Sequence, residues 1–141
     1  MAVDVVAGSS ARQLSVPDPS SPTLLEFYAT TCVTCNEMMP SVTAVHEQFG
    51  TEAQMLAVTN ERYKDDASLQ SDWASKGGEW PLARDTETAT LATRYDGIVT
   101  PTFVVVDSAG REQWRHQGFA RTEELLTGVE SGLEQAESSR Q

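Results

Sequence analysis

Short apolar runs alternate with amphipathic stretches along the chain, and this alternation predicts a mixture of β-strands and α-helices. The apolar runs are short and rich in aromatic, β-branched or leucine side chains, a composition typical of buried strands. Strands are therefore predicted at 23–28, 54–59, 80–83, 102–106 and 112–117. The last two should pair as a hairpin through a turn at 108–110.

Apolar side chains recur at three- and four-residue spacing between these runs, and that spacing predicts amphipathic helices. The first helix runs from Cys35 to Phe49 and stops at Gly50. Pro40 lies inside it, where it removes one backbone hydrogen bond and should kink the helix about one turn after the cysteines. Further helices are predicted at 66–76, 85–95 and 122–135, the last with Thr122 as its N-cap.

The order of these elements predicts an α/β domain with a mixed central β-sheet and helices on both faces. We assign this domain to residues 23–135, within a chain of 141 residues that is long enough to bury a core without disulfide staples. Residues 1–22 hold three of the six prolines and many serines, so we interpret them as a partly flexible leader with one short strand around 13–16. Residues 136–141 are expected to fray.

The charge balance narrows the classes of partner. Ten Lys and Arg residues stand against 21 Asp and Glu residues, and the formal net charge of −11 disfavours binding to nucleic acid or to anionic lipid. No apolar run approaches the roughly 20 residues that span a bilayer. The first ten residues have neither a basic segment nor a long apolar segment, so the chain as given carries no export signal, although a signal or anchor could have been removed from a precursor.

The chemistry of the sequence is concentrated in its two cysteines, Cys32 and Cys35, which stand two residues apart where a strand passes into a helix. Backbone N–H groups and the partial positive charge at a helix N-terminus stabilise a thiolate. Cys32 is therefore the predicted nucleophile. Cys35, one turn further along, is close enough to attack a mixed disulfide at Cys32 and release the reduced partner.

Two other interpretations of the cysteine pair, a zinc site and a structural disulfide, have less support in the sequence. A zinc site needs two more soft ligands, but no other cysteine exists and His46 and His116 are isolated in the sequence. A purely structural disulfide would close a loop over only two residues and would restrain the unfolded chain little. We therefore predict no metal and no cofactor.

Glu26 and two tryptophans each have two interpretations. Glu26 lies six residues before Cys32 on a strand that should be central, where burial would raise its pKa and let it take the proton from Cys35; alternatively it is a solvated residue facing an edge. Trp73 and Trp80 either line a partner surface or pack in the core.

The segments around the cysteines and around Pro101 resemble those of a known family. The segment Leu25–Ala29 leading into Cys32 and Cys35, with Pro40 in the following helix, resembles thioredoxins. The segment Thr100–Phe103 is similar to the cis-proline loop of that family, which packs beside the cysteines and offers backbone to an extended substrate. The resemblance implies the thioredoxin fold.

Some residues depart from the usual thioredoxin pattern. Thr31 replaces the aromatic residue that normally precedes the first cysteine, and Val33-Thr34 replaces Gly-Pro between the cysteines. The chain before Pro101 is also longer than in a minimal thioredoxin, and Trp80–Asp85 followed by a helix is similar to the insertion of TlpA- and ResA-like proteins. We therefore expect an inserted helix and strand before the cis-proline loop.

The residues and the resemblance together predict a thiol:disulfide oxidoreductase that exchanges its dithiol with protein disulfides as a reductant, fed by an upstream thiol reductant. They favour a monomer that works outside the cytoplasm, anchored or exported, over a cytoplasmic one. The alternative is a non-enzymatic redox sensor or binding module that uses the same dithiol as a switch. The predicted catalytic residues are Cys32, Cys35 and Glu26, and the predicted substrate contacts are Thr31, Val33, Thr34, Thr100 and Pro101.

Overall fold

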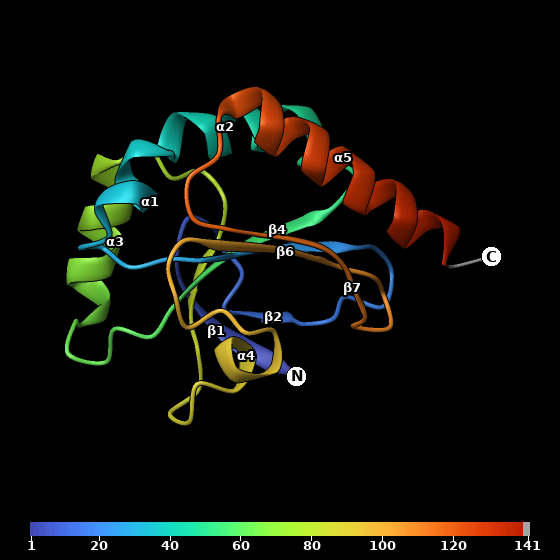
Figure 1. The fold of residues 1–141 in the computed structure, drawn as a ribbon. Coiled ribbons are helices and arrows are strands. Elements are labelled where there is room, and N and C mark those ends of the chain that lie inside the picture. The colour runs from blue at the N-terminus through green and yellow to red at the C-terminus, as the bar shows by residue number, and fades with distance from the viewer. Residues whose placement is uncertain (140–141) are drawn as a thin grey trace.

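A seven-stranded mixed sheet forms the centre of the structure, a computed structural model that describes residues 1–139 (Figure 1). Its strands are β1 (Ala2–Ala7), β2 (Gln13–Ser15), β3 (Thr23–Phe27), β4 (Gln54–Thr59), β5 (Leu82–Arg84), β6 (Thr102–Val106) and β7 (Glu112–Gln117). Across the sheet their order is β2-β1-β5-β4-β3-β6-β7. Because β3 pairs in parallel with β4 and antiparallel with β6, the strand that leads into the cysteines is central.

Helices cover both faces of this sheet (Figure 1). They are α1 (Val33–Glu37), α2 (Met39–Phe49), α3 (Asp66–Ser75), α4 (Thr90–Arg94) and α5 (Thr122–Ser138). Buried side chains of α1, α2, α3 and α5 form one core with one face of the sheet, and those of α4 form a second core with the other face. The predicted fold class, a mixed sheet between helices, is confirmed.

Successive side chains of β3 point into opposite cores, because side chains alternate between the two faces of a strand. Leu24 joins the core under α2 and α5, whereas Leu25 joins the core under α4. All five residues of β3 are buried, because a central strand covered on both faces has no solvent side. Glu26 follows the alternation of Leu24 and therefore belongs to the face on which Cys35 is buried.

The N-terminal segment is more regular than the predicted leader. Its predicted short strand exists as β2, but the prediction missed β1, which pairs antiparallel with both β2 and β5. The register between β1 and β5 shifts between Val5 and Ala7, and Val3 and Val6 are the two residues of β1 that are buried. This irregularity breaks the two-residue period by which a strand is recognised in sequence.

The helix predicted from Cys35 to Phe49 is divided in two. It starts earlier, at Val33, and is interrupted at Met38, after which α2 begins. Pro40 lies in the first turn of α2. A proline there lacks the N–H that would bond the carbonyl of Asn36, and its ring crowds that carbonyl, so the interruption lies just ahead of the proline.

Two other helices have different ends from those predicted. The helix predicted from residue 85 begins only at Thr90, because the buried carboxylate of Asp85 accepts the backbone N–H groups of Thr86, Leu91 and Ala92 instead of continuing a helix. Thr122 is the first helical residue of α5 and not its N-cap. Its hydroxyl instead bonds that of Ser41 on α2, at 2.6 Å.

The predicted frayed tail at 136–141 is helical in its first part, since α5 continues to Ser138 and buries Ala136. Residues 140–141 lie outside the described residues. Within the part of the chain that is described, no helix is both long enough and apolar enough to cross a membrane.

Candidate active site

The two cysteines lie where β3 passes into α1, and their sulfurs are joined in a disulfide with a Cα–Cα distance of 5.2 Å. Cys32 is the N-cap of α1, and its Sγ accepts the backbone N–H of Cys35 at 3.1 Å. Cys35 is fully buried, whereas Cys32 is partly exposed. A partner can therefore reach the sulfur of Cys32 but not that of Cys35.

Glu26 lies buried behind the cysteines on β3, and only 2% of its surface is exposed. Trp80 Nε1 donates to its Oε1 at 3.3 Å, and its Oε2 is buried without a hydrogen-bond partner among residues 1–139. Burial raises the pKa of Glu26 to about 7, although the bond from Trp80 acts to lower it. These positions exclude the solvated, edge-facing interpretation of Glu26.

A second carboxylate, Glu61, holds the backbone just before Cys32. Its two oxygens accept the backbone N–H of Thr30 at 2.7 Å and the Thr30 hydroxyl at 2.6 Å. They also accept the hydroxyls of Thr59 and Tyr63. Burial pushes the pKa of Glu61 upward, but these hydrogen bonds outweigh it and leave the pKa below its ordinary value. Glu61 is therefore an ionised anchor for the loop that carries the nucleophile.

The helix α3 holds the same loop from another side. Lys76, the C-cap of α3, donates through Nζ to the carbonyl of Thr30 at 3.1 Å and to the hydroxyl of Tyr28. Tyr28 in turn donates to Asp72 at 2.8 Å, and Asp72 pairs with Lys76 at 2.9 Å. Burial and the neighbouring Asp72 both raise the pKa of Tyr28.

Sequence reasoning missed Glu61, Asp72, Lys76 and Tyr28 as parts of the site. Glu61 and Lys76 stand 31 and 46 residues from Thr30, and no local pattern marks them as its partners. The only signal in the sequence for Glu61 was an acidic residue two positions after the strand predicted at 54–59.

Trp73 and Trp80 are each only 1% exposed and belong to the core on the α2 side of the sheet. Trp73 Nε1 donates to the carbonyl of Trp80 at 2.8 Å. Burial overturns the alternative in which these two side chains line a partner surface, and agrees with core packing. Trp80, from the segment between α3 and β5, points its indole N–H toward Glu26.

The loop at Thr100 and Pro101 leads into β6, whose first residue, Thr102, pairs with Phe27 at the end of β3. The peptide bond between these two residues is cis, and Gly118 N–H donates to the carbonyl of Pro101 at 2.8 Å. Thr100 shares a hollow of about 190 Å³ with the end of β3, which passes into the cysteine loop, and with the residues after β4. Of the other residues predicted to contact substrate, Thr31 and Val33 are exposed and Thr34 is half-buried.

Residues 7–135 match the sequence model of a family described as Redoxin. The chain belongs to the Redoxin family. Among curated relatives, the chloroplastic Thioredoxin Y of Oryza sativa subsp. japonica is 27% identical over 115 residues, which cover 82% of this chain and 53% of that protein. This Redoxin-family chain thus spans about half the length of the curated relative it matches.

Solved structures share the fold of this Redoxin-family chain. StoA from Bacillus subtilis superposes with a TM-score of 0.76 at 15% identity, covering 92% of this chain and 95% of that one. A secreted Mycobacterium tuberculosis disulfide oxidoreductase homologous to E. coli DsbE superposes with a TM-score of 0.74 at 17% identity, covering 93% and 95%. The predicted thioredoxin fold and the resemblance to the thioredoxin superfamily are confirmed.

Several large apolar side chains of this Redoxin-family chain are exposed, some of them in segments that carry predicted site residues. Five such residues lie between the cysteines, after β4, before the Thr100 loop or directly after Gly118, and each is more than half exposed: Val33, Tyr63, Ile98, Val99 and Phe119. Val33 lies between the cysteines in the sequence, and Ile98 shares the hollow of about 190 Å³ with Tyr63 and Thr100.

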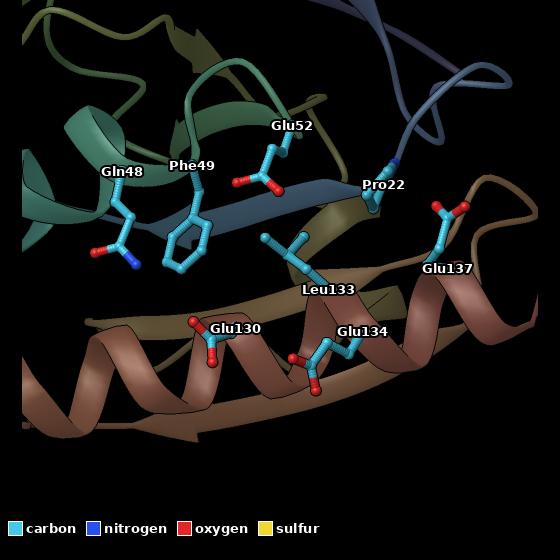
Figure 2. Close-up of a pocket in the computed structure, with 8 residues that line it drawn as sticks. All are labelled: Pro22, Gln48, Phe49, Glu52, Glu130, Leu133, Glu134 and Glu137. Atoms are coloured by element: carbon cyan, nitrogen blue, oxygen red, sulfur yellow. The ribbon is translucent and has the colours of Figure 1, made fainter.

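Another hollow, of about 470 Å³, lies between α2 and α5 and contains none of these groups (Figure 2). Phe49 and Leu133 line it together with four carboxylates: Glu52, Glu130, Glu134 and Glu137. Within residues 1–139, no group of three or more His, Cys, Asp or Glu side chains could hold a metal ion. His46 and His116 instead lie apart, against the ring of Trp80 and the carbonyl of Phe119.

Proposed function

We propose that this chain is a thiol:disulfide oxidoreductase that exchanges the Cys32 and Cys35 dithiol with protein disulfides and acts as a reductant. The observation that carries the proposal is the asymmetry of the pair. Cys32 caps a helix and is reachable from solvent, whereas Cys35 is fully buried on the same face as the carboxylate of Glu26. One sulfur is thus suited to attack a partner and the other to resolve the adduct.

The first step is attack by the Cys32 thiolate on a partner disulfide. A bond forms between Cys32 and one partner sulfur, the partner's own S–S bond breaks, and its second sulfur leaves as a thiolate. The backbone N–H of Cys35, which bonds Cys32 Sγ in this structure, stabilises negative charge on that sulfur before attack.

The second step releases the partner. Cys35 passes its proton to Glu26, and the resulting thiolate attacks the sulfur of Cys32. The Cys32–Cys35 disulfide forms and the remaining partner sulfur leaves, so the partner gains two electrons that the dithiol loses. An upstream thiol reductant then restores the dithiol.

The surroundings of Cys32 support a protein substrate. Thr31, Val33 and Thr34 from one loop and Thr100 and Pro101 from the other are the residues we propose to contact it. The exposed apolar side chains around them offer more contact to a polypeptide segment than to a small polar thiol.

We further propose that the chain acts as a monomer outside the cytoplasm. One structural relative is a secreted disulfide oxidoreductase, which supports this location. The acidic surface, with a net charge of −11, favours a solvated monomer in either compartment.

Turnover separates the proposed catalyst from a redox sensor. In the presence of dithiothreitol, a catalyst should reduce many equivalents of insulin per molecule of protein, because each cycle regenerates the dithiol. A sensor that merely switches state would reduce insulin at the uncatalysed rate, and that result would exclude the proposed activity. Cys32→Ser provides the inactive control, since it lacks the predicted nucleophile.

Trapping of mixed disulfides tests whether Cys32 is the nucleophile and Cys35 the resolving thiol. Cys35→Ser should accumulate long-lived mixed disulfides with partner proteins, because no second thiol in the chain can release them. Cys32→Ser should accumulate far fewer, since its remaining cysteine is buried. Mass spectrometry of non-reduced adducts makes the comparison and identifies the partners. Equal trapping by both variants would sink the two-cysteine mechanism.

A further inference from the structure

The carboxylate of Glu26 receives one hydrogen bond from residues 1–139, and its donor is the indole of Trp80. Trp80 stands 54 residues further along the chain, in the segment between α3 and β5. The bond engages Oε1 and leaves Oε2 buried and unpartnered. The two oxygens of this carboxylate therefore have different environments, and Oε2 is the one free to accept a proton.

The indole of Trp80 is buried, and neighbouring groups contact both its ring and its backbone carbonyl. Trp73 donates to the carbonyl of Trp80 at 2.8 Å, and its ring packs edge-on against that of Trp80 at a centroid distance of 5.3 Å. The ring of His46 packs on Trp80 at 5.5 Å. Gly8 of the β1–β2 turn lies so close that a Cβ there would overlap the Trp80 carbonyl. The donor is thus preorganised by three separate elements.

We propose that Trp80 is a positioning residue for partner release, whose N–H fixes Oε1 of Glu26 and so assigns Oε2 to receive the proton of Cys35, directly or through one water. This inference rests on the proposed dithiol–disulfide exchange. The proton leaves the Cys35 thiol for Oε2, the sulfur's electron pair forms the bond to Cys32, and the electrons of the broken bond leave with the partner's sulfur. No further oxidant or reductant takes part.

The hydrogen bond from Trp80 determines in which direction its loss would change the pKa of Glu26. A hydrogen bond to a carboxylate stabilises the charged form, so Trp80 opposes the rise in pKa that burial imposes on Glu26. Losing the N–H should raise the pKa of Glu26 further and move the pH dependence of partner release upward by about one unit. The other titratable groups around this part of the core come from three helices and from the segments that follow β3, β4 and α3: Cys35, His46, Tyr28, Asp72, Lys76 and Glu61.

The first experiment uses the unaltered protein. In the oxidised form neither cysteine titrates, so the indole N–H resonance of Trp80 should shift with pH around the pKa of Glu26, about 7. The shift should disappear in Glu26→Gln and persist in His46→Gln, while the indole of Trp73, which bonds a carbonyl, should move less. A resonance that does not titrate, or that follows His46, overturns the proposal.

The second experiment uses Trp80→Phe with both cysteines intact, a variant that keeps an aromatic ring and removes the N–H. Rapid acid quenching measures, as a function of pH, how fast Cys35 releases a model partner bound to Cys32 as a mixed disulfide. Trp114→Phe is the matched control, because Trp114 lies on β7 and makes no bond to Glu26. The midpoint should rise only in the Trp80 variant. An unchanged profile there, with an altered profile in Glu26→Gln, overturns the role of Trp80 alone. Unchanged profiles in both overturn the proton transfer on which it rests. If Trp80→Phe does not fold, the titration of the unaltered protein decides.

Discussion

Burial of Glu26 lowers the stability of the folded protein when the carboxylate is ionised, and it also gives the residue the raised pKa on which the proposed proton transfer depends. An ionised carboxylate with one unpaired oxygen in the middle of a sheet costs the folded state free energy, and the protein reduces this cost by holding a proton more tightly. The pKa of Glu26 rises from 4.5 to about 7, so the folded state binds the proton where the unfolded state has lost it. The contribution to stability is fully present below pH 4.5 and is lost as the pH rises through about 7.

Glu26→Gln should therefore stabilise the protein above neutral pH. The rise in pKa corresponds to roughly 3 kcal/mol, an upper bound on the gain, because a buried amide also leaves hydrogen-bonding groups unpaired. Urea unfolding of both proteins at several pH values between 5 and 8 makes the comparison. The advantage of the variant should grow with pH. Two stability curves that run parallel would show that Glu26 is not titrating in this range.

The pKa of Glu61 is shifted in the opposite direction from that of Glu26. Its hydrogen bonds favour the charged form, so its pKa is lowered and the stability it contributes is present above its unfolded pKa and lost in acid. Two buried glutamates near one dithiol therefore differ in pKa because of their hydrogen-bond partners: among residues 1–139, Glu26 has one donor and Glu61 has four.

At the scale of elements, the packing of α5 depends on how closely its backbone approaches the sheet. The helix α5 runs across β7, and at Gly128 its backbone meets the ring of Trp114 directly, so that a Cβ there would overlap the ring. Gly132 lies one turn on, against Val105 of β6 and the same tryptophan. These glycines lower the helix propensity of α5 but allow it to pack against the sheet.

Gly128→Ala should lower the free energy of unfolding even though alanine is the better helix former. Propensity favours the variant by about 1 kcal/mol, whereas forcing a methyl group into a closely packed contact costs about 1–3 kcal/mol. Thermal or urea unfolding measures the difference, with Ser131→Ala, at an exposed position of the same helix, as the control for propensity alone. In a Trp114→Ala background the sign should reverse. A Gly128→Ala variant that is as stable as its parent would mean that α5 can shift freely.

At the scale of the whole molecule, acidic side chains outnumber basic ones by 21 to 10. The net charge of −11 creates a field that attracts cationic partners and repels anionic ones, and salt screens it. Exposed apolar residues such as Val33, next to Cys32, act only at contact, so the field affects the approach of a partner and these residues affect its docking.

Reaction rates with small disulfides of opposite charge test this field. Raising the ionic strength from about 0.01 M to about 1 M shortens the screening length from about 30 Å to about 3 Å. Reduction of the dication cystamine should then slow, and reduction of the dianion 5,5′-dithiobis(2-nitrobenzoate) should accelerate. The uncharged 2-hydroxyethyl disulfide is the control. If salt changes all three rates in the same direction, charge steering by the protein is absent.

Much of the fold was predictable because its elements are encoded locally. The strands β4, β6 and β7 have the predicted ends, since uninterrupted apolar or alternating runs specify both period and length. The strand β1 was not predictable in this way, because its irregular pairing with β5 obscures the period. The interruption at Met38 and the late start of α4 at Thr90 depend on hydrogen bonds that no hydrophobic pattern contains.

By itself, the sequence determined the fold class, the place of Cys32 and Cys35 at the junction of a strand and a helix, and the position of Glu26 on a central strand. These follow from spacing within about ten residues, over which local propensity and hydrophobic period act. Only the tertiary structure decided that Cys35 is sealed from solvent, that Trp80 bonds Glu26, and that Glu61 and Lys76 hold Thr30. The partners in these bonds are 31 to 54 residues apart, and they meet because the sheet order places β3 beside β4 and α3 against the end of the same strand.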